Sequence, residues 1–184
     1  MFLSKGKLIK KYSKNSIVVQ KHGGRYELKD KKAHIWLQAR EEFYIPKDVN
    51  EEIAVIQLWK EGLMAKADTA RSFCEYYLLT DNILCVNWKR GGMPLRGTEK
   101  EIMQWFKDGR RRLRMEELVY LIENRINPSD YEKDEFGVAL SERIYRSRIQ
   151  VENVLRREMS CAKRRDEVVN AVLRLFGKNR MYLL

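Results

Sequence analysis

The first 28 positions contain short runs of apolar residues, many of them β-branched or aromatic, between polar ones. Residues 8–12 and 16–20 have this β-strand character, and the pair Gly23–Gly24 separates them from a third run at residues 25–28, in which polar and apolar residues alternate. Side chains of a strand point alternately to its two faces, and glycine adopts the backbone angles that tight turns need. The pattern therefore predicts a β-hairpin at the start of the chain.

Helical spacing replaces the alternation after residue 28. Over residues 29–43, Ile35, Trp36 and Ala39 recur on one side of a helix, which predicts a helix with these side chains buried. Pro46 ends this helix, because proline steers the residue before it away from helical geometry.

The next helix is predicted from Asn50 to Gly62. Asparagine is a common capping residue at a helix start, and glycine is common just after a helix end. Ile53, Ile56 and Trp59 follow one another at helical spacing. We therefore expect these three side chains to form the buried face of the helix.

The second half of the chain repeats this order. The apolar run 82–88, a turn at Gly91–Gly92 and the run 93–96 predict a second hairpin. A helix that Gly109 ends follows at once. Thr98 and Glu101 have the spacing of a capping box, in which each side chain accepts a hydrogen bond from a backbone N–H.

The remaining segments complete the prediction of a mainly helical α+β chain. Further elements are predicted at residues 68–79 (helix), 115–126 (helix), 128–137 (loop), 140–159 (long helix), 169–176 (helix) and 181–184 (strand). The apolar stripe of the long helix suits an interface as well as an internal position.

The two halves share a spacing between apolar anchors. Leu28 and Ile35 have the same separation as Leu95 and Ile102, and a tryptophan-bearing helix follows each hairpin. The order hairpin, helix, short connection and helix resembles the winged-helix family of helix-turn-helix domains. The first copy also resembles the small winged-helix modules that bind leader peptides. The resemblance implies two winged-helix-like units with short antiparallel hairpins, residues 1–80 and residues 81–184, the second with a C-terminal helical extension.

Composition narrows the class of protein. The chain has 184 residues, of which 44% are hydrophobic, enough to bury one core or two small ones. Cys74, Cys85 and Cys161 are far apart and odd in number, which indicates reduced thiols rather than disulfides or a metal knuckle. The sequence has no apolar run of transmembrane length. We therefore expect a cytoplasmic protein.

Charge adds a candidate partner. The chain carries 37 Lys and Arg against 26 Asp and Glu, a net charge of +11, and such an excess attracts polyanions. Basic clusters and one tryptophan at a basic turn predict a nucleic-acid-binding surface, because cations neutralise phosphates and aromatic rings stack on bases. Its predicted residues are Lys29, Lys31, Lys32, Trp88, Lys89, Arg90, Arg110, Arg111, Arg112, Arg114, Lys163, Arg164 and Arg165.

The sequence favours a binding protein over an enzyme. It contains no phosphate-binding glycine loop, no zinc-protease helix and no nucleophile elbow. We therefore expect no catalytic residues and no cofactor. His22 and His34 have no second metal ligand at useful spacing, so we expect no metal either. The predicted function is nucleic-acid binding, to DNA rather than RNA, in transcription regulation, and a protein partner or a homodimer is compatible with it.

A peptide-interaction module is the alternative. In this hypothesis the edge of the N-terminal hairpin captures an extended peptide by adding it as a further strand, and the acidic helix at residues 50–62 provides complementary charge. The lysines of the first 14 residues are open to two interpretations. They can form a polybasic arm for nucleic acid or for an anionic membrane surface, or they can simply keep an exposed strand edge soluble and unpaired.

Overall fold

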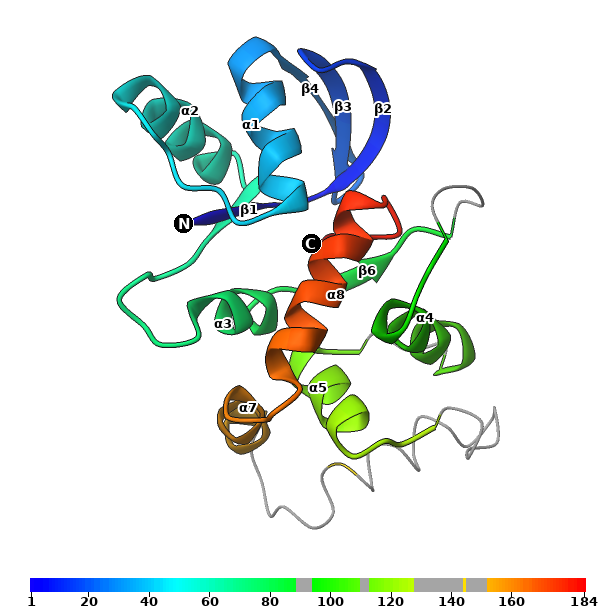
Figure 1. Ribbon diagram of the computed structural model, residues 1–184. Coiled ribbons are helices and arrows are strands. Elements are labelled where there is room, and N and C mark those ends of the chain that lie inside the picture. Colours follow the sequence, from blue (N-terminus) through cyan, green and yellow to red (C-terminus); the bar gives the residue numbers. More distant parts are fainter. Residues whose placement is uncertain (89–93, 110–112, 128–143, 145–151) are drawn as a thin grey trace.

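The computed structural model describes residues 1–88, 94–109, 113–127, 144 and 152–184. These residues form an α+β protein, which confirms the predicted class, with seven helices and three small antiparallel sheets (Figure 1). The strands are β1 (Phe2–Ser4), β2 (Lys7–Ser13), β3 (Ser16–Lys21), β4 (Gly24–Lys29), β5 (Met64–Lys66), β6 (Leu84–Val86) and β7 (Met181–Leu183). The helices are α1 (Asp30–Glu41), α2 (Val49–Lys60), α3 (Cys74–Thr80), α4 (Thr98–Gly109), α5 (Met115–Glu123), α7 (Glu152–Ser160) and α8 (Arg165–Gly177).

The predicted N-terminal hairpin is present, and the run before it adds a strand, so that β2, β3 and β4 form one antiparallel sheet. His22 and Gly23 turn the chain between β3 and β4 with positive φ angles of 46° and 84°. Ile17, Val19 and Leu28 are buried against α1, which packs on one face of the sheet. Helix α1 itself buries Ile35 and Trp36, as predicted.

Helix α2 differs from its prediction at its start. The capping residue is Asp48, whose Oδ1 accepts a hydrogen bond from the Glu51 backbone N–H at 2.8 Å. Asn50 lies inside the first turn instead. Both residue types cap helices, and the structure uses the carboxylate, which also interacts favourably with the helix dipole.

The buried face of α2 also differs from its prediction. Ala54 and Leu58 are buried, whereas Ile53, Ile56 and Trp59 are 51%, 37% and 46% exposed. The helix is apolar on opposite sides, so spacing alone cannot select the side that packs. The smaller side chains of the buried side permit a close approach of α2 to α1 and β5, which are its neighbours.

The predicted second hairpin is wrong. Strand β6 pairs with β7, and Leu84 lies opposite Leu183, while residues 94–96 form no strand. Pro94 lacks the N–H that a strand partner donates, and Met181 and Leu183 bring apolar side chains that are fully buried. The predicted C-terminal strand is thereby confirmed as β7. It pairs with β6 in place of residues 93–96, which the sequence predicted as the partner.

The capping box at the start of α4 is also wrong. Gly97 precedes the helix, and its carbonyl accepts the Glu101 N–H. The Thr98 hydroxyl donates to Glu167 on α8 instead of capping. The helix itself is confirmed, and its Trp105 is buried.

Most of the remaining helix predictions are confirmed. Helix α5 buries Leu118, Leu121 and Ile122, and α8 buries Val172 and Phe176. Helix α3 begins later than predicted, after Phe73 with its left-handed φ of 58°. The predicted turn at residues 89–92, the loop at 128–137 and most of the helix at 140–159 lie outside the described residues, although α7 covers the end of that helix.

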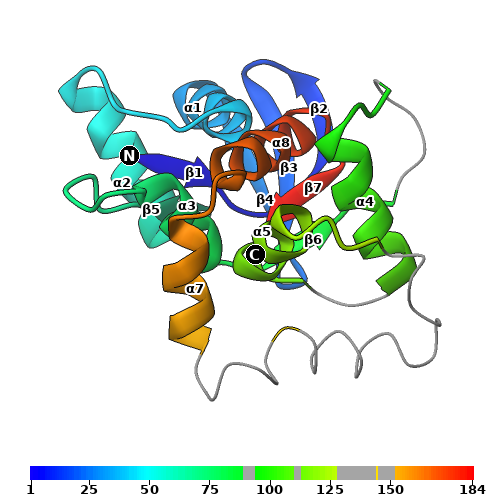
Figure 2. The same ribbon diagram turned by 60° about the horizontal axis from the view of Figure 1, so that its bottom comes forward.

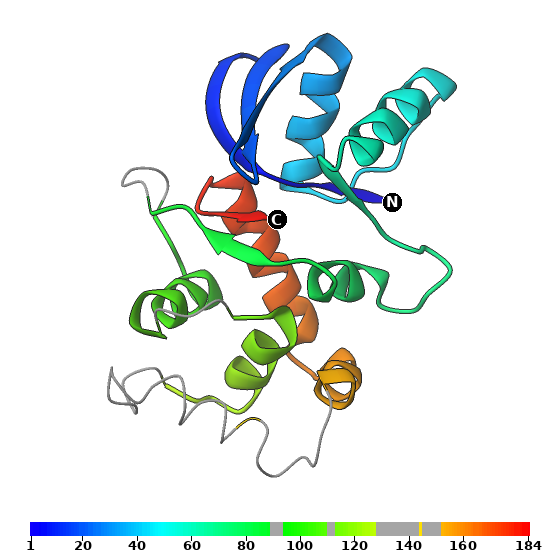
Figure 3. The ribbon, with the colours of Figure 1, turned by 180° about the vertical axis from the view of Figure 1, so that it is seen from behind.

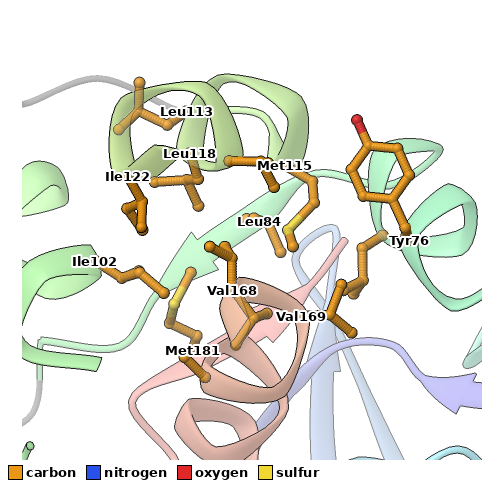
Figure 4. Close-up of a cluster of buried hydrophobic side chains, with 14 of the residues drawn as sticks. Tyr76, Leu84, Ile102, Leu113, Met115, Leu118, Ile122, Val168, Val169 and Met181 are labelled. Carbon is orange, nitrogen blue, oxygen red and sulfur yellow. The ribbon is translucent and has the colours of Figure 1, made fainter. Parts of the chain in front are cut away.

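Helix α8 organises the second half of the molecule. Figure 4 shows Val168 and Val169 of α8 among side chains from α3, α4, α5, β6 and β7. Figure 2 shows α3, α4 and α5 arranged around this helix. The other end of α8 reaches α1, where the Arg40 guanidinium donates to Asn179 Oδ1 at 2.6 Å.

Buried apolar residues fall into two clusters. One consists of residues between positions 2 and 64, and the other of Leu3 and residues between 65 and 183. Strand β1 supplies a residue to each, since Phe2 lies in the first cluster and Leu3 in the second. The division into units at residue 80 stays a prediction.

Candidate nucleic-acid interface

The face of the three-stranded sheet that points away from α1 carries the candidate site. Residues directly opposite each other in an antiparallel sheet point to the same face. Three cross-strand rows lie on this face, which we call the outer sheet face. The rows are Lys7–Gln20–Arg25, Lys10–Val18–Glu27 and Ser13–Ser16–Lys29.

The outer sheet face is predominantly cationic. Lys10, Arg25 and Lys29 are exposed and Lys7 is half-buried. The carboxylate in the three rows belongs to Glu27, whose Oε1 lies 3.5 Å from Lys29 Nζ. The three rows thus hold four cations and one carboxylate that already has a cationic neighbour, which leaves a surplus of three positive charges.

An aromatic ring lies beside the cations. Tyr12 is 59% exposed, and Lys10 Nζ lies 4.3 Å from the centre of its ring. An exposed tyrosine ring offers a stacking surface for a base, and a neighbouring lysine neutralises a phosphate. The two side chains together provide both kinds of contact.

A β-bulge puts both Lys7 and Lys10 of β2 on this face. The pairing of β2 with β3 shifts between Leu8 and Lys10 and again between Lys11 and Ser13. In a regular strand, Lys7 and Lys10 would point to opposite faces because they are three residues apart. A bulge adds one residue and brings both to the outer side.

The start of the sheet is attached to the rest of the protein at Gly6. Its N–H donates to the Leu183 carbonyl at 2.7 Å, and its φ of 102° is accessible to glycine. A Cβ atom at this position would lie 2.6 Å from Cγ1 of Val19. Gly6 therefore permits a close approach to Val19 of β3 while its N–H links the start of the sheet to β7.

Among the nucleic-acid-binding residues that the sequence predicted and the structure describes, Lys29 lies in a row of the outer sheet face. Lys31 and Lys32 start α1 and form ion pairs with α2, at 3.5 Å to Asp48 and 2.9 Å to Glu61. These two lysines therefore join two helices.

The basic cluster at the start of α8 has partners inside the protein. Arg164 Nε donates to Glu167 Oε2 at 2.8 Å, and Arg165 Nε donates to Asp166 Oδ1 at 2.8 Å. The Arg165 guanidinium also lies 3.8 Å from the centre of the Phe73 ring. Lys163 is exposed. Figure 1 places this cluster at the opposite end of α8 from the sheet, and 13 helical residues span roughly 20 Å.

The other predicted contact residues are scattered. Trp88 is 58% exposed just after β6, and Arg114 is exposed at the start of α5. Lys89, Arg90 and the three arginines at 110–112 (Arg110, Arg111 and Arg112) lie outside the described residues. The predicted residues that the structure describes thus do not gather into one surface, and each stays a prediction.

A cavity of about 740 Å³ lies beside the Arg164 cluster. Its lining residues are Gly97, Lys100, Glu101, Gln104, Arg125, Ile126, Asn127 and Arg164. Burial raises the pKa of Glu101 above its ordinary value, although Arg164 acts in the opposite direction. The lining includes the Glu101 carboxylate, and Arg164 is already bonded to Glu167, so the cavity is less suited to a polyanion than the outer sheet face.

The predicted site did not include Arg25 or the neighbouring Tyr12, and it left out Lys7 and Lys10, which the sequence offered only as part of a polybasic arm. The alternation of Arg25, Glu27 and Lys29 was visible in the sequence and indicates a shared face. The positions of Lys7 and Lys10 depend on the bulge, which leaves no sequence signal of its own.

Other kinds of site have no support in the described part of the chain. It holds no cluster of three potential metal ligands, its cysteines are free, and none of its helices has the length and apolar character needed to cross a bilayer. Comparison with known protein families, curated proteins and solved structures found no match.

Proposed function

We propose that the protein binds nucleic acid through the outer sheet face. The observation that carries this proposal is that Lys7, Lys10, Arg25 and Lys29 share one face of the sheet with a single carboxylate. Cations on a protein surface release the counterions condensed on nucleic acid, which supplies most of the sequence-independent affinity. Gln20 and Ser16 lie between the cations and offer hydrogen bonds to phosphate oxygens.

The proposed ligand is DNA in the first place. The winged-helix resemblance of the sequence favours DNA over RNA and a role in transcription regulation, and both are part of the proposal. The cations and polar side chains of the outer sheet face are suited to contacts with the sugar–phosphate backbone of DNA. Tyr12 is exposed and can stack on an accessible base.

The test compares salt dependence in a triple variant and a matched control. Lys7→Ala/Lys10→Ala/Arg25→Ala removes three cations of the outer sheet face, whereas Lys47→Ala/Lys100→Ala/Lys107→Ala removes three exposed lysines elsewhere. Fluorescence anisotropy with labelled DNA at several salt concentrations gives the slope of log affinity against log salt. The outer-face variant should reduce the slope by about 2 to 3, since each phosphate contact contributes about 0.9.

The control variant separates location from total charge. It should keep a slope close to that of the wild-type chain, although both variants lose the same formal charge. Equal losses in the two variants would contradict the proposed site. Binding that is lost only in Arg110→Glu/Arg112→Glu would move the site to the arginines at 110–112.

Peptide binding at the edge of β4 is a second candidate, and a difference between the two sheet edges favours it. Strand β2 is rich in lysine and bulged, which protects an edge from pairing, whereas β4 pairs with β3 in unbroken register over six residues. A regular edge accepts an added strand, and Arg25 and Lys29 favour an acidic peptide. Slowed amide hydrogen exchange confined to β4 on adding an acidic peptide, at physiological salt, would support this candidate over DNA.

A further inference from the structure

An apolar stripe lies on the outward side of α2. It consists of Val49, Ile53, Ile56 and Trp59, whose exposed fractions run from 37% to 71%. Ile45, in the loop before the helix, is exposed as well. Scattered exposed apolar residues are ordinary, but four on one 12-residue helix form a continuous surface that indicates an interaction site.

The position of α2 leaves the stripe accessible. The helix packs on α1 and β5 through Ala54, Val55 and Leu58. Figures 1 and 3 show α2 at the margin of the molecule, with α1 on its inner side.

Charges at the two ends of α2 define what fits the stripe. Three acidic residues are already engaged: Asp48 and Glu61 form ion pairs with Lys31 and Lys32, and Glu51 accepts the Lys47 N–H at 2.8 Å. Two exposed charges remain, at opposite ends of the helix. Glu52 in the first turn and Lys60 in the last form no ion pair with any described residue.

This distribution is self-complementary in the antiparallel sense. If two copies of α2 lie side by side and run in opposite directions, the acidic first turn of each copy lies beside the basic last turn of the other. The helix dipoles are then also antiparallel, which is favourable. A two-fold axis near Ile56 makes the same patch contact itself, as in the commonest symmetric dimers.

We propose that the chain forms a two-fold symmetric homodimer in which the apolar stripes of two antiparallel α2 helices pack together. The occupant of the stripe is therefore a second copy of this chain. The proposal does not depend on nucleic-acid binding, because the outer sheet face has no part in it.

Analytical ultracentrifugation of the full chain without nucleic acid tests the proposal. When the concentration of the wild-type protein is raised roughly hundredfold, the fraction of dimer should rise as a monomer–dimer equilibrium requires. Ile53→Glu should raise the dimer dissociation constant about tenfold or more, because it buries a charge in an apolar contact. Val154→Glu, at an exposed apolar position of α7, is the matched control and should leave the equilibrium unchanged.

A charge exchange tests the orientation of the helices. Glu52→Lys should weaken the dimer, and the added change Lys60→Glu should restore it, because an antiparallel pair then regains opposite charges at both ends. Circular dichroism confirms that each variant is folded. A wild-type chain that stays monomeric, an Ile53→Glu variant that dimerises normally or a double variant that fails to recover would overturn the proposal.

Discussion

At the residue scale, Glu167 shows how single charges hold the helices together. It accepts hydrogen bonds from Arg164 and from the Thr98 hydroxyl, and it thereby joins α8 to α4. These bonds lower the pKa of Glu167 from 4.5 to about 2, although partial burial acts in the opposite direction. Its charged form is therefore favoured in the folded protein.

The shifted pKa predicts a pH dependence of stability. A carboxylate whose folded pKa is lowered contributes stability above its unfolded pKa, and this contribution is lost as the pH falls toward the folded value. Glu167→Gln should therefore lower the free energy of unfolding at pH 7. As the pH falls from 4.5 to about 2, the variant should lose less unfolding free energy than the wild type. Urea unfolding at several pH values measures this, with Glu42→Gln, at an exposed position outside the proposed dimer contact, as control. An unchanged pH profile would contradict the role of Glu167.

At the element scale, two helices depend on tryptophans in different clusters. Trp36 of α1 lies in the first cluster and donates its Nε1–H to the Lys5 carbonyl at 3.2 Å. Trp105 of α4 lies in the second cluster. Both rings are fully buried, so their environments differ in neighbours and not in exposure.

Both tryptophans should be important for stability. Trp36→Ala and Trp105→Ala should each cost about 3 to 5 kcal/mol of unfolding free energy, because each leaves a large cavity. Trp59→Ala, at a 46% exposed position, should cost much less in dilute solution. Urea denaturation monitored by circular dichroism measures all three, and equal effects at positions 59 and 36 would contradict the assigned burial.

The sequence predicted helices better than it predicted partners. Burial of Trp36 and the limits of α4 follow from local spacing and glycine, and both predictions are confirmed. The partner of β6 lies at the far end of the chain, so no local pattern identifies it. The buried side of α2 depends on the shape of α1, which is a tertiary property. Among the cations of the outer sheet face, Lys29 was in the predicted site. The positions of Lys7 and Lys10 depend on a bulge of β2, whereas Arg25 was overlooked although it alternates with Glu27 and Lys29 in the sequence.

At the scale of the whole molecule, Arg40 connects the two apolar clusters. It is 5% exposed, lies 5.8 Å from the Trp36 ring centre and donates to Asn179 beyond the end of α8. Burial lowers the pKa of Arg40 to about 10, so the side chain is still charged at pH 7. The contact of α1 with α8 adds to this connection.

The connection predicts cooperative unfolding. The wild-type chain should unfold in one transition, with tryptophan fluorescence and circular dichroism changing together. Arg40→Ala removes the bond to Asn179 and the contact with the Trp36 ring. The variant should therefore unfold in two separate transitions, or in one transition with a lower midpoint by both fluorescence and circular dichroism. Coincident transitions at the wild-type midpoint would show that the clusters are joined by other contacts.

The most direct test of the central claim is an amide NMR titration of the ¹⁵N-labelled chain with a short DNA duplex. The account predicts shift changes concentrated at Lys7, Lys10, Tyr12, Arg25 and Lys29, reversed by added salt. Shift changes that leave β2, β3 and β4 unaffected, or no change at low salt, would contradict nucleic-acid binding by the outer sheet face.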